Sequence, residues 1–562
     1  MSSQDRVRPV AIAIGVDIGV STSGISYCLV GPSGGLFGPP ASVLLCNERA
    51  PLQPSVLGKI SGPENWGTAV ESEADKLTLL KLALLEDELQ DDAQHPDHLR
   101  AVQEELSKIT DAGYNGVTVL TEYMKRMWAV AKDQLLRNIE DDCANMVPGS
   151  LKIGFVFGIP AVWEEQTAGR MEQAIARSGM TGGAYFTDLV FEPEAAALAV
   201  LPYFVQKHLL QKDETVVIAD LGGGTMDFIS YTVSSDTPLE VNECVSGKGR
   251  LLGDMFMKSA LQSLIKAEAE ARLGVDIANF NQHRFQAQVD KVWTNATLLQ
   301  GGALDLADWS IEVLAERQDG AVMASFHVHG IDIVETFRSI TNGIVELAQS
   351  QVANLMVVVG GFGRNKFLQV ELRNHFGNDF VFFTEGGGQL AVKHGAALHG
   401  VTKFAREIAA SQTVASQSVA SQGTASGEEP TRVTSRIARQ SYGAWMGTGP
   451  KDLVQWFINK FSMTIWRPTL APPIVLPRAA FQAKIDRDLP CVPILKCGRK
   501  TKRIQSIDGM KTRNPCQIRC KRPDLLYQIE ELQLKPRLNA RQQVEFDVPQ
   551  DLTAIFEVER LG

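Results

Sequence analysis

The feature that most constrains the fold is a glycine-rich stretch, VVIADLGGGTMDFISYTV, at residues 216–233. Four apolar residues lead into Asp220, and three glycines, Thr225 and Asp227 follow. A run that is apolar at every position is typical of a strand buried on both faces of a sheet. The glycines would let backbone N–H groups approach a phosphate closely, and the two acids could hold Mg²⁺ through its waters. The structural alternative is a glycine-rich hairpin capped by acids, with no ligand.

Two other stretches favour the phosphate interpretation. Residues 11–30 repeat the plan, with an apolar strand, Asp17, Gly19, small hydroxyl residues and a second apolar strand. Residues 355–376 give a buried strand, a turn of glycines and a helix with Arg364 in its first turn. Two acid-bearing hairpins and a late glycine turn, in this order, indicate a nucleotide site. They resemble the two phosphate motifs and the adenosine motif of the actin-like ATPase superfamily.

Composition limits the class of protein. A chain of 562 residues is too long for one core, and two to four domains are expected. A net charge of −10 argues against general nucleic-acid affinity. No apolar run approaches the ~20 residues of a membrane span, and the N-terminal sequence lacks the apolar core of a signal peptide. Eight cysteines are too few for a disulfide scaffold in a chain of this length. We therefore expect a cytoplasmic or nuclear protein that is not secreted.

Apolar spacing before residue 410 predicts strands alternating with helices. Residues 117–139 have the clearest amphipathic pattern, with Val130 among the expected core positions. The alanine-rich stretch after Glu192 is expected to pack closely on a sheet because its side chains are small. Lys81 and Lys76 lie in a leucine-rich stretch with helical spacing. Helices are predicted at residues 73–88, 91–109, 117–139, 162–178, 255–271, 285–300, 330–347 and 389–410.

The composition changes abruptly after residue 410. Residues 411–432 are rich in Ser, Gln and Ala and cannot bury enough apolar surface to offset their ordering entropy, so we expect a flexible linker. Residues 433–562 are typical of short strands. Residues 496–522 are dense in Lys and Arg, which favours a basic surface loop over a nucleic-acid site. The C-x5-C and C-x3-C spacings of the last four cysteines do not favour a zinc site.

Four segments narrow the resemblance to the 70-kDa heat-shock protein family. They are GIPAVWEEQTAGRMEQAIARSGM at 158–180, FEPEAAALAVL at 191–201, ADLGGGTMDF at 219–228 and HGAALHG at 394–400. The resemblance spans roughly residues 11–409. The sequences PAVW, GGFGRNKFL and KLALL look closer to the divergent heat-shock-protein-12-like branch of fungi and animals.

The resemblance implies a role for each matched residue. It implies metal ligation for Asp17 and Asp227, and water activation for Asp220 and Thr225. Glu192 would sense the bound metal–nucleotide, and Lys81 would lie beside the γ-phosphate, with Lys76 as the alternative. The implied nucleotide contacts are Gly19, Ser21, Gly222, Gly223, Gly224, Gly253, Lys291, Gly360, Gly361 and Arg364.

The resemblance also implies a fold and a function. The fold is an α/β actin-like ATPase of two ribonuclease-H-like lobes around a nucleotide cleft at residues 1–410. A small β-rich substrate-binding-like domain without a helical lid follows at 433–562. The function is a slow Mg²⁺-dependent ATPase that binds ATP or ADP, with polypeptide clients or co-chaperones as partners. No specific nucleic acid or membrane is expected, and the chain would be a monomer or of unknown oligomeric state.

Departures from the family pattern leave two alternatives open. Val20 stands where the mainstream members have Thr, Ala168 stands where their relay arginine is expected, and the apolar interdomain linker is missing. The first alternative is a nucleotide-gated binding protein with negligible hydrolysis. The second is a small-molecule kinase of the same superfamily, which would need an aspartate base aimed at a substrate hydroxyl.

Overall fold

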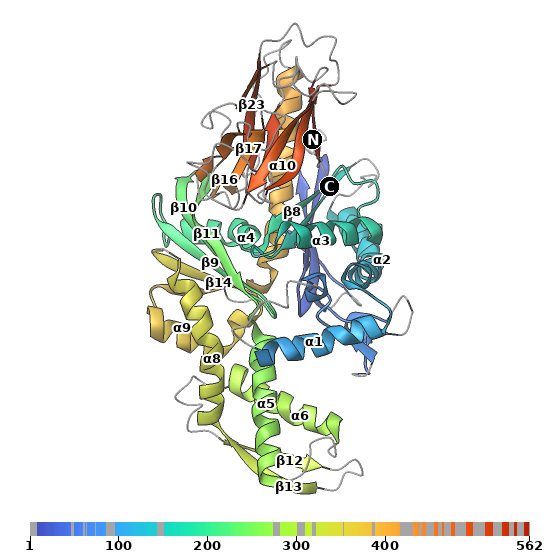
Figure 1. Cartoon of the computed structure of the whole chain (residues 1–562), viewed down its shortest axis with the longest axis vertical. Coiled ribbons are helices and arrows are strands. Elements are labelled where there is room, and N and C mark those ends of the chain that lie inside the picture. Colours follow the sequence, from blue (N-terminus) through green and yellow to red (C-terminus); the bar gives the residue numbers. More distant parts are fainter. Residues whose placement is uncertain are drawn as a thin grey trace, which may run out of the picture. The chain divides into compact units, whose positions relative to one another are not determined.

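The computed structural model divides the chain into two compact units (Figure 1). The first comprises Met1–Ile229 and Gly247–Thr431, and the second Ser230–Ser246 and Arg432–Gly562. The structure describes residues 8–45, 50–59, 62, 65–72, 75–85, 96–142, 151–273, 281–299, 310–316, 322–351, 353–384, 388–415, 431–437, 441–445, 454–458, 463–465, 474–477, 491–497, 512–520, 531–538, 544–547 and 556–560.

The first sheet of the first unit is built on the hairpin at residues 11–30. Strand β1 (Ala11–Ile18) pairs antiparallel with β2 (Thr22–Val30) and parallel with β7 (Lys152–Ile159). Strand β8 (Phe186–Phe191) continues the sheet on one side, and β3 (Ala41–Val43) and β4 (Gln53–Pro54) pair with β2 on the other. Nearly every residue of β1 is buried, as expected for a strand covered on both faces.

The second sheet of this unit contains the glycine-rich hairpin. Strand β9 (Thr215–Leu221) lies between β14 (Leu355–Val359) and β10 (Met226–Asp236), and β15 (Val381–Phe383) forms the edge beyond β14. Strands β9 and β14 are parallel, with Asp220 opposite Val359. The carboxyl ends of these two strands therefore meet at one edge of the sheet, and the turn after each strand lies there.

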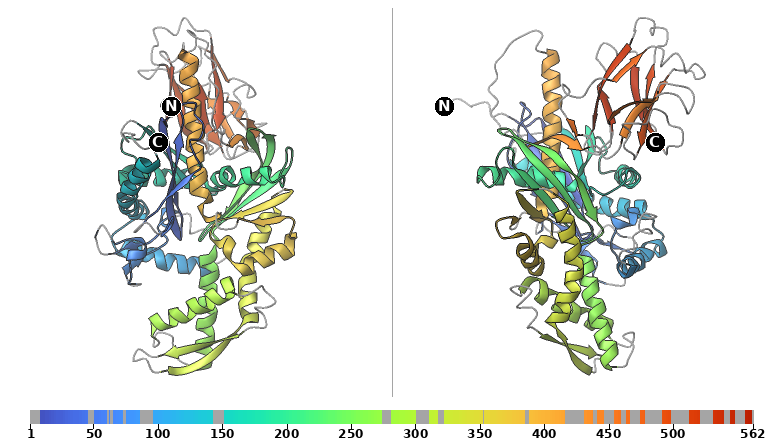
Figure 2. Two further views of the ribbon diagram at one scale, coloured as in Figure 1. Left: turned by 180° about the vertical axis from the view of Figure 1, so that it is seen from behind. Right: turned by 60° about the vertical axis from the view of Figure 1, so that its left-hand side comes forward.

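The alanine-rich helix packs closely, as its small side chains predict. Helix α4 (Glu192–Gln206) buries Ala195, Ala196 and Ala197 completely. Helix α10 (Ala391–Ala415) contacts α4 and lies on β1, β2 and β7, as the rear view of Figure 2 shows. A Cβ atom at Gly395 of α10 would lie 1.6 Å from the Ala195 carbonyl oxygen, so only glycine permits this helix–helix approach.

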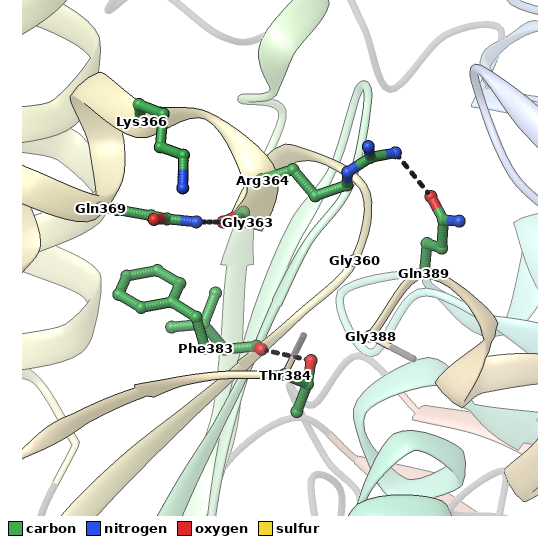
Figure 3. Close-up of a pocket in the computed structure, with 10 residues that line it drawn as sticks. Gly360, Gly363, Arg364, Lys366, Gln369, Phe383, Thr384, Gly388 and Gln389 are labelled. Atoms are coloured by element: carbon green, nitrogen blue, oxygen red, sulfur yellow. Dashed lines mark hydrogen bonds between the residues drawn. The ribbon is translucent and has the colours of Figure 1, made fainter. Parts of the chain in front are cut away.

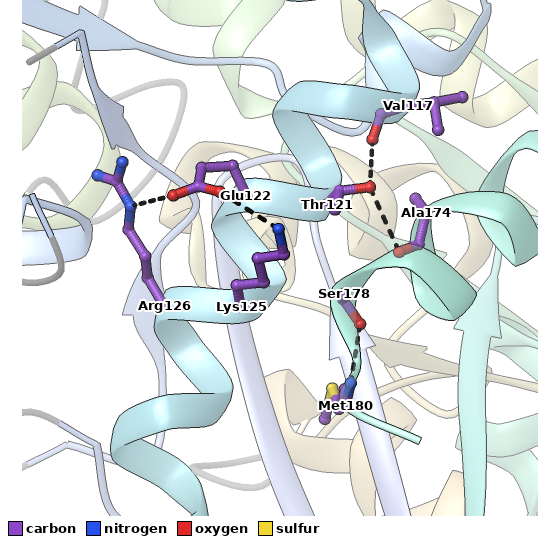
Figure 4. Close-up of polar contacts among 8 residues, drawn as sticks. All are labelled: Val117, Thr121, Glu122, Lys125, Arg126, Ala174, Ser178 and Met180. Atoms are coloured by element: carbon purple, nitrogen blue, oxygen red, sulfur yellow. Dashed lines mark hydrogen bonds and ion pairs between the residues drawn. The ribbon is translucent and has the colours of Figure 1, made fainter. Parts of the chain in front are cut away.

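Helix α2 (Gly116–Asp142) confirms the amphipathic pattern except at one position. Met124 and Met127 are fully buried, but Val130 is 38% exposed, so its expected place in the core is wrong. The helix packs against α3 (Glu165–Ser178), and the Thr121 hydroxyl lies 2.7 Å from the Val117 carbonyl and 3.4 Å from that of Ala174 (Figure 4). Gly179 ends α3 with a φ of 73°, the left-handed conformation that glycine adopts without strain.

The helix predicted at residues 73–88 is wrong. Strand β6 (Lys76–Leu77) pairs with β5 (Leu57–Gly58), and Leu79 has a φ of 55°, which no helix tolerates. Leu80 and Leu84 are nevertheless fully buried. Only residues 82–85 form a short 3-10 turn, so the leucine spacing indicated burial and not an α-helix over 73–88.

The other helices lie near their predicted ranges. They are α1 (Pro96–Asp111), α5 (Asp254–Leu273), α6 (Gln282–Thr294), α8 (Gly330–Gln349) and α9 (Lys366–Phe376). Arg364 lies in the 3-10 turn before α9, so its expected place in the first turn of this helix is wrong. This unit also contains a short π-helix (Asn295–Leu299) and 3-10 turns at Gly67–Ala69, 82–85, Phe362–Arg364 and Gly388–Leu390. Strands β12 (Ser310–Glu316) and β13 (Val322–His329) form a hairpin. Helix α10 extends to Ala415, inside the stretch expected to be a linker, and residues 416–430 lie outside the described residues.

The second unit consists of strands in the parts that the structure describes. Strand β11 (Leu239–Arg250) pairs parallel with β16 (Arg432–Ile437), and β16 pairs antiparallel with β19 (Met463–Ile465). One sheet has the order β18 (Val454–Ile458), β17 (Ser441–Trp445), β21 (Cys491–Cys497), β22 (Thr512–Cys520) and β25 (Phe556–Arg560). Another has the order β20 (Ile474–Pro477), β23 (Glu531–Leu538) and β24 (Val544–Asp547).

The mixed α/β architecture is compatible with the expected actin-like ATPase fold. No helix in the described parts of the chain has the length and apolar character that a membrane span requires.

Candidate functional site

The turns of the two glycine hairpins lie against each other. The Gly19 N–H donates to the Thr22 carbonyl at 3.1 Å, and the Gly222 N–H donates to the Thr225 carbonyl at 3.0 Å. A Cβ atom at Gly223 would lie only 1.9 Å from Ser21 Oγ. The chain therefore requires glycine where the two turns meet.

A cavity of about 380 Å³ opens at these turns, and we call it the hairpin cavity. It lies within the 300–1,000 Å³ range typical of small-molecule sites. Residues from both hairpins, from the start of α4, from the turn after β14 and from the start of α10 form its wall. The sequence-predicted site residues among them are Asp17, Gly19, Ser21, Lys81, Glu192, Asp220, Gly222, Gly223, Thr225, Gly360 and Gly361.

A buried ion pair joins Lys81 to Glu192 in the wall of this cavity. Lys81 is 1% exposed, and its ammonium donates to Glu192 Oε1. Burial lowers the pKa of Lys81, but the carboxylates of Glu192 and Asp17 more than offset it and leave the pKa raised. The Lys81 ammonium also lies 5.5 Å from the centre of the Trp163 ring. Lys76, the alternative, lies on β6 and does not line the cavity.

Buried acids crowd around this single ion pair. Burial, followed by the charges of Glu192 and Asp17, raises the pKa of Asp220 well above its usual value. Burial and the charge of Glu192 likewise raise the pKa of Asp17 to about 7 and that of Asp227 to about 7. Such an excess of carboxylates attracts a cation, and oxygen donors of this kind suit a hydrated Mg²⁺.

Asp227 lies behind the cavity and not in its wall. It is 1% exposed, and its Oδ1 accepts from the Val162 N–H at 3.2 Å. Within the described parts of the chain, no three His, Cys, Asp or Glu side chains gather as direct ligands of a metal ion. Binding through the metal's waters, as the sequence predicts, does not require such a group.

A second cavity of about 490 Å³ lies beside Arg364, and we call it the side cavity (Figure 3). Gly360, Gly388 and Gln389 line both cavities. Arg364 Nη1 donates to Gln389 Oε1 at 3.4 Å, and both residues line the side cavity. Its other described lining residues are Val358, Gly363, Lys366, Gln369, Phe383 and Thr384.

Three further predicted nucleotide contacts line neither cavity. Gly224 packs against Val20, because a Cβ atom there would lie 2.8 Å from a Val20 methyl. Gly253 packs against the second hairpin, where a Cβ atom would lie 2.2 Å from the Gly223 carbonyl oxygen. Lys291 is exposed on α6. Gly224 and Gly253 therefore pack against residues that line the hairpin cavity, whereas Lys291 is not part of the wall of either cavity.

Sequence reasoning missed Asp254, Gln389 and Lys393. Asp254 lines the hairpin cavity at the start of α5, and burial raises its pKa to about 6. Lys393 is fully buried on α10, and its Nζ donates to the Pro51 carbonyl at 2.7 Å. An acid directly after a glycine at a predicted helix start was the available signal for Asp254. No local signal marked Lys393, because its partners lie hundreds of residues away.

The raised pKa of Asp17 predicts a pH-dependent effect of Asp17→Asn on stability. The folded pKa, about 7, exceeds the usual value of 3.8, so ionisation of Asp17 costs stability as the pH rises between these values. In buffer with a chelator, the melting temperature of the variant relative to the wild type should therefore rise by several degrees between pH 5 and pH 7.5. Melting curves at both pH values measure this, and a constant difference would contradict the burial of an uncompensated Asp17 charge.

Comparison with known proteins identifies distant relatives. The chain is 28% identical over 238 residues to the chaperone protein dnaK of Emiliania huxleyi, covering 41% of this chain and 36% of that protein. It is 26% identical over 260 residues to the chaperone protein DnaK of Thermosipho africanus (strain TCF52B), covering 44% and 40%. Over these segments the chain is similar to DnaK chaperones. The matches span less than half the length of either relative. No protein-family model matches the chain.

The similarity to DnaK supports a relationship to the 70-kDa heat-shock proteins at the level of distant homology. Both relatives are named DnaK, so the heat-shock-protein-12-like branch stays a prediction.

Proposed function

We propose that this chain binds Mg²⁺–ATP in the hairpin cavity and hydrolyses it slowly, as a divergent protein of the 70-kDa heat-shock type. One observation carries the proposal: the turns of both hairpins meet the Lys81–Glu192 pair and Asp220 in the wall of a single cavity. With Gly360 and Gly361, the predicted site residues in this wall come from five separate stretches of sequence. Such convergence is expected of a site and not of a glycine-rich hairpin that has no ligand.

The turns and the lysine would hold the phosphates. Backbone N–H groups of the two glycine turns would donate to phosphate oxygens, and Lys81 would turn from Glu192 toward the γ-phosphate. Asp17, with Asp227 behind it, would hold Mg²⁺ through its waters. When bound, the metal ion neutralises charge on the phosphate oxygens.

Asp220 would orient the attacking water and accept its proton, and Thr225 would hold that water through its hydroxyl. The raised pKa of Asp220 suits a group that accepts a proton during the reaction. Glu192 would contact the bound metal–nucleotide once Lys81 leaves it. Positioning and charge stabilisation then supply most of the catalysis, as in other phosphoryl transfers.

The chain would act on other polypeptides. We assign nucleotide binding to residues 1–410 and client binding to residues 433–562, joined by the linker at 411–432. Similarity to proteins named as chaperones supports polypeptide clients and co-chaperones as partners. The PAVW and GGFGRNKFL sequences favour the heat-shock-protein-12-like branch.

Val20 favours a second candidate, a nucleotide-gated binding protein with negligible turnover. Its side chain is 6% exposed and packs against Gly224 where the two hairpins meet. A methyl group there offers no hydroxyl to the phosphates or to the metal's waters.

Two assays on the full chain separate these functions. We expect ATP to raise the melting temperature in the presence of Mg²⁺, and phosphate to be released from ATP without any added substrate. Binding without phosphate release would favour the gated binder. Release only after a small-molecule acceptor is added would favour a kinase, and no binding at all would refute the proposal.

A further inference from the structure

The ring of Trp163 lies beside the buried ion pair on which the proposed mechanism depends. The Lys81 ammonium is 5.5 Å from the centre of this ring, within the ~6 Å over which the face of an aromatic ring attracts a cation. Trp163 is 8% exposed and Lys81 is 1% exposed, so little water screens the attraction. Among aromatic side chains, tryptophan has the most strongly attracting face. The proposed reaction uses Lys81 and leaves this ring without a role.

The ring contacts Lys81 through its face, and its N–H makes no comparable contact. Within the described parts of the chain, Trp163 Nε1 is buried and donates to no acceptor. A buried donor that makes no hydrogen bond destabilises the fold, so hydrogen bonding does not account for tryptophan at this position. A smaller apolar side chain would avoid that cost, and what tryptophan adds is a ring face beside a cation.

The backbone that carries the ring is anchored to the acids of the candidate site. The Trp163 N–H donates to the Pro160 carbonyl at 3.2 Å, in the turn that follows β7. The Val162 N–H donates to Asp227 Oδ1 at 3.2 Å. The turn is therefore held by one of the residues that we assign to metal binding.

The segment that carries Lys81 is anchored to the helix that follows this turn. Arg170 of α3 donates from Nη1 to the Leu84 carbonyl at 2.6 Å. Leu84 belongs to the 3-10 turn at residues 82–85, directly after Lys81. Since the backbone on both sides of the contact is held, a change of partner by Lys81 falls to its side chain.

The proposed change of partner requires a second stabilising contact for Lys81. When the ammonium leaves Glu192, it loses a hydrogen bond before it reaches the γ-phosphate, and little water is available to replace that bond. A hydrogen bond needs a narrow range of angles, whereas a ring face attracts a cation at many positions within about 6 Å. The Trp163 ring can therefore stabilise the ammonium at either partner and between them.

We propose that Trp163 is a positioning residue for Lys81, and that its ring holds the ammonium at the hairpin cavity while Lys81 exchanges Glu192 for the γ-phosphate. This inference rests on the proposed function, because it assumes that Lys81 contacts that phosphate.

Three variants of the full chain test it. Trp163→Leu keeps an apolar side chain without a ring, and Trp163→Phe keeps a weaker ring face and loses the N–H. Trp128→Leu is the matched control, because Trp128 of α2 contacts the edge of Phe155 at 5.4 Å and does not line the hairpin cavity. Single-turnover phosphate release measures the reaction. ADP affinity measures the rest of the site, because ADP has no γ-phosphate for Lys81 to contact.

We expect Trp163→Leu to slow phosphate release about tenfold, or ~1.4 kcal/mol, and to change ADP affinity less than twofold. Trp163→Phe should be intermediate, about threefold slower than the wild type, and Trp128→Leu should release phosphate at the wild-type rate. Equal losses of phosphate release and ADP affinity in Trp163→Leu would show general damage to the cavity and overturn the inference. If leucine prevents folding, the phenylalanine variant decides, and a wild-type rate in it would overturn the inference.

A double-mutant cycle tests whether the ring acts through Lys81. In a Lys81→Met background the cation is absent, so Trp163→Leu should slow phosphate release less than twofold further. The cycle is repeated on the melting temperature of the ligand-free chain, in which the two side chains are also in contact. Additive effects in both measurements would overturn the inference. Failure of the wild type to bind ATP would instead refute the proposed function, and the melting temperatures would still test the contact.

Discussion

Replacing Asp220 with asparagine should lower ATP hydrolysis about 100-fold and leave ATP binding intact. Asparagine keeps the size of the side chain but cannot accept the proton of an attacking water. Removal of a positioned general base typically costs 10²- to 10⁴-fold in rate. The effect should fall on kcat, because Asp220 is assigned to the reaction and not to the ground-state complex.

Loss of folding should not contribute to this effect, for an electrostatic reason. Burial and the charges of Glu192 and Asp17 raise the pKa of Asp220, so the ionised carboxylate destabilises the folded protein. Asparagine removes that charge, and the variant should be at least as stable as the wild type at neutral pH. A melting curve checks this before any rate is compared.

Asp213→Asn is the matched control. Asp213 precedes the same strand, is exposed, and has a φ of 71°, a left-handed conformation that asparagine adopts readily. Single-turnover phosphate release, with ATP affinity measured separately, distinguishes the variants. Turnover of Asp220→Asn within threefold of the wild type would remove Asp220 from the reaction.

The two hairpins could be predicted from local sequence, because a few consecutive residues carry all the groups that define them. A buried strand, an acid and a glycine turn specify both conformation and ligand chemistry, and Asp17, Gly19, Asp220 and Gly222 all line one cavity. The start of α4 at Glu192 followed in the same way from a strand, a proline at the second helical position and an alanine run.

Backbone conformation could not be predicted where residues are buried by contacts with distant parts of the chain. Leu80 and Leu84 have helical spacing, yet they are buried around a short strand and turn. Lys81 still enters the hairpin cavity, because its position depends on Glu192, 111 residues further along the chain. The positions of Lys393 and Gln389 could not be predicted for the same reason, because contacts between distant parts of the chain leave no periodic pattern in the sequence.

The side cavity was the least predictable part of the candidate site. The resemblance implied Lys291 as a nucleotide contact, but Lys291 lines neither cavity, whereas Lys366 and Gln369 of α9 line the side cavity. Both residues were visible in the sequence. Only the spatial proximity of α9 to β15 and the shared cavity with the 3-10 turn at Gly388–Leu390 distinguish them from ordinary surface residues of a helix.

Replacing Gly223 with valine should abolish nucleotide binding. A Cβ atom at this position would lie 1.9 Å from Ser21 Oγ and 2.8 Å from Ser21 Cβ, which rotation of the hydroxyl cannot relieve, and valine adds two methyl groups beyond it. Contacts under 3.0 Å force the chain to move, so the two turns that form the wall of the hairpin cavity must separate. The space and the backbone N–H groups that phosphates need are then lost together.

A thermal shift assay with Mg²⁺–ATP measures the loss. At 100 times its dissociation constant, a ligand stabilises the folded state by about 2.7 kcal/mol, which gives a clear shift for the wild type. Gly223→Val should show no shift. Gly169→Val is the matched control, because Gly169 lies in α3 with open space around its missing Cβ atom, and this variant should shift like the wild type. If valine prevents folding, Gly223→Ala imposes the same first contact with less volume, and it should bind ATP at least tenfold more weakly. A folded Gly223→Val that shifts as much as the wild type would show that phosphates bind somewhere other than between these hairpins.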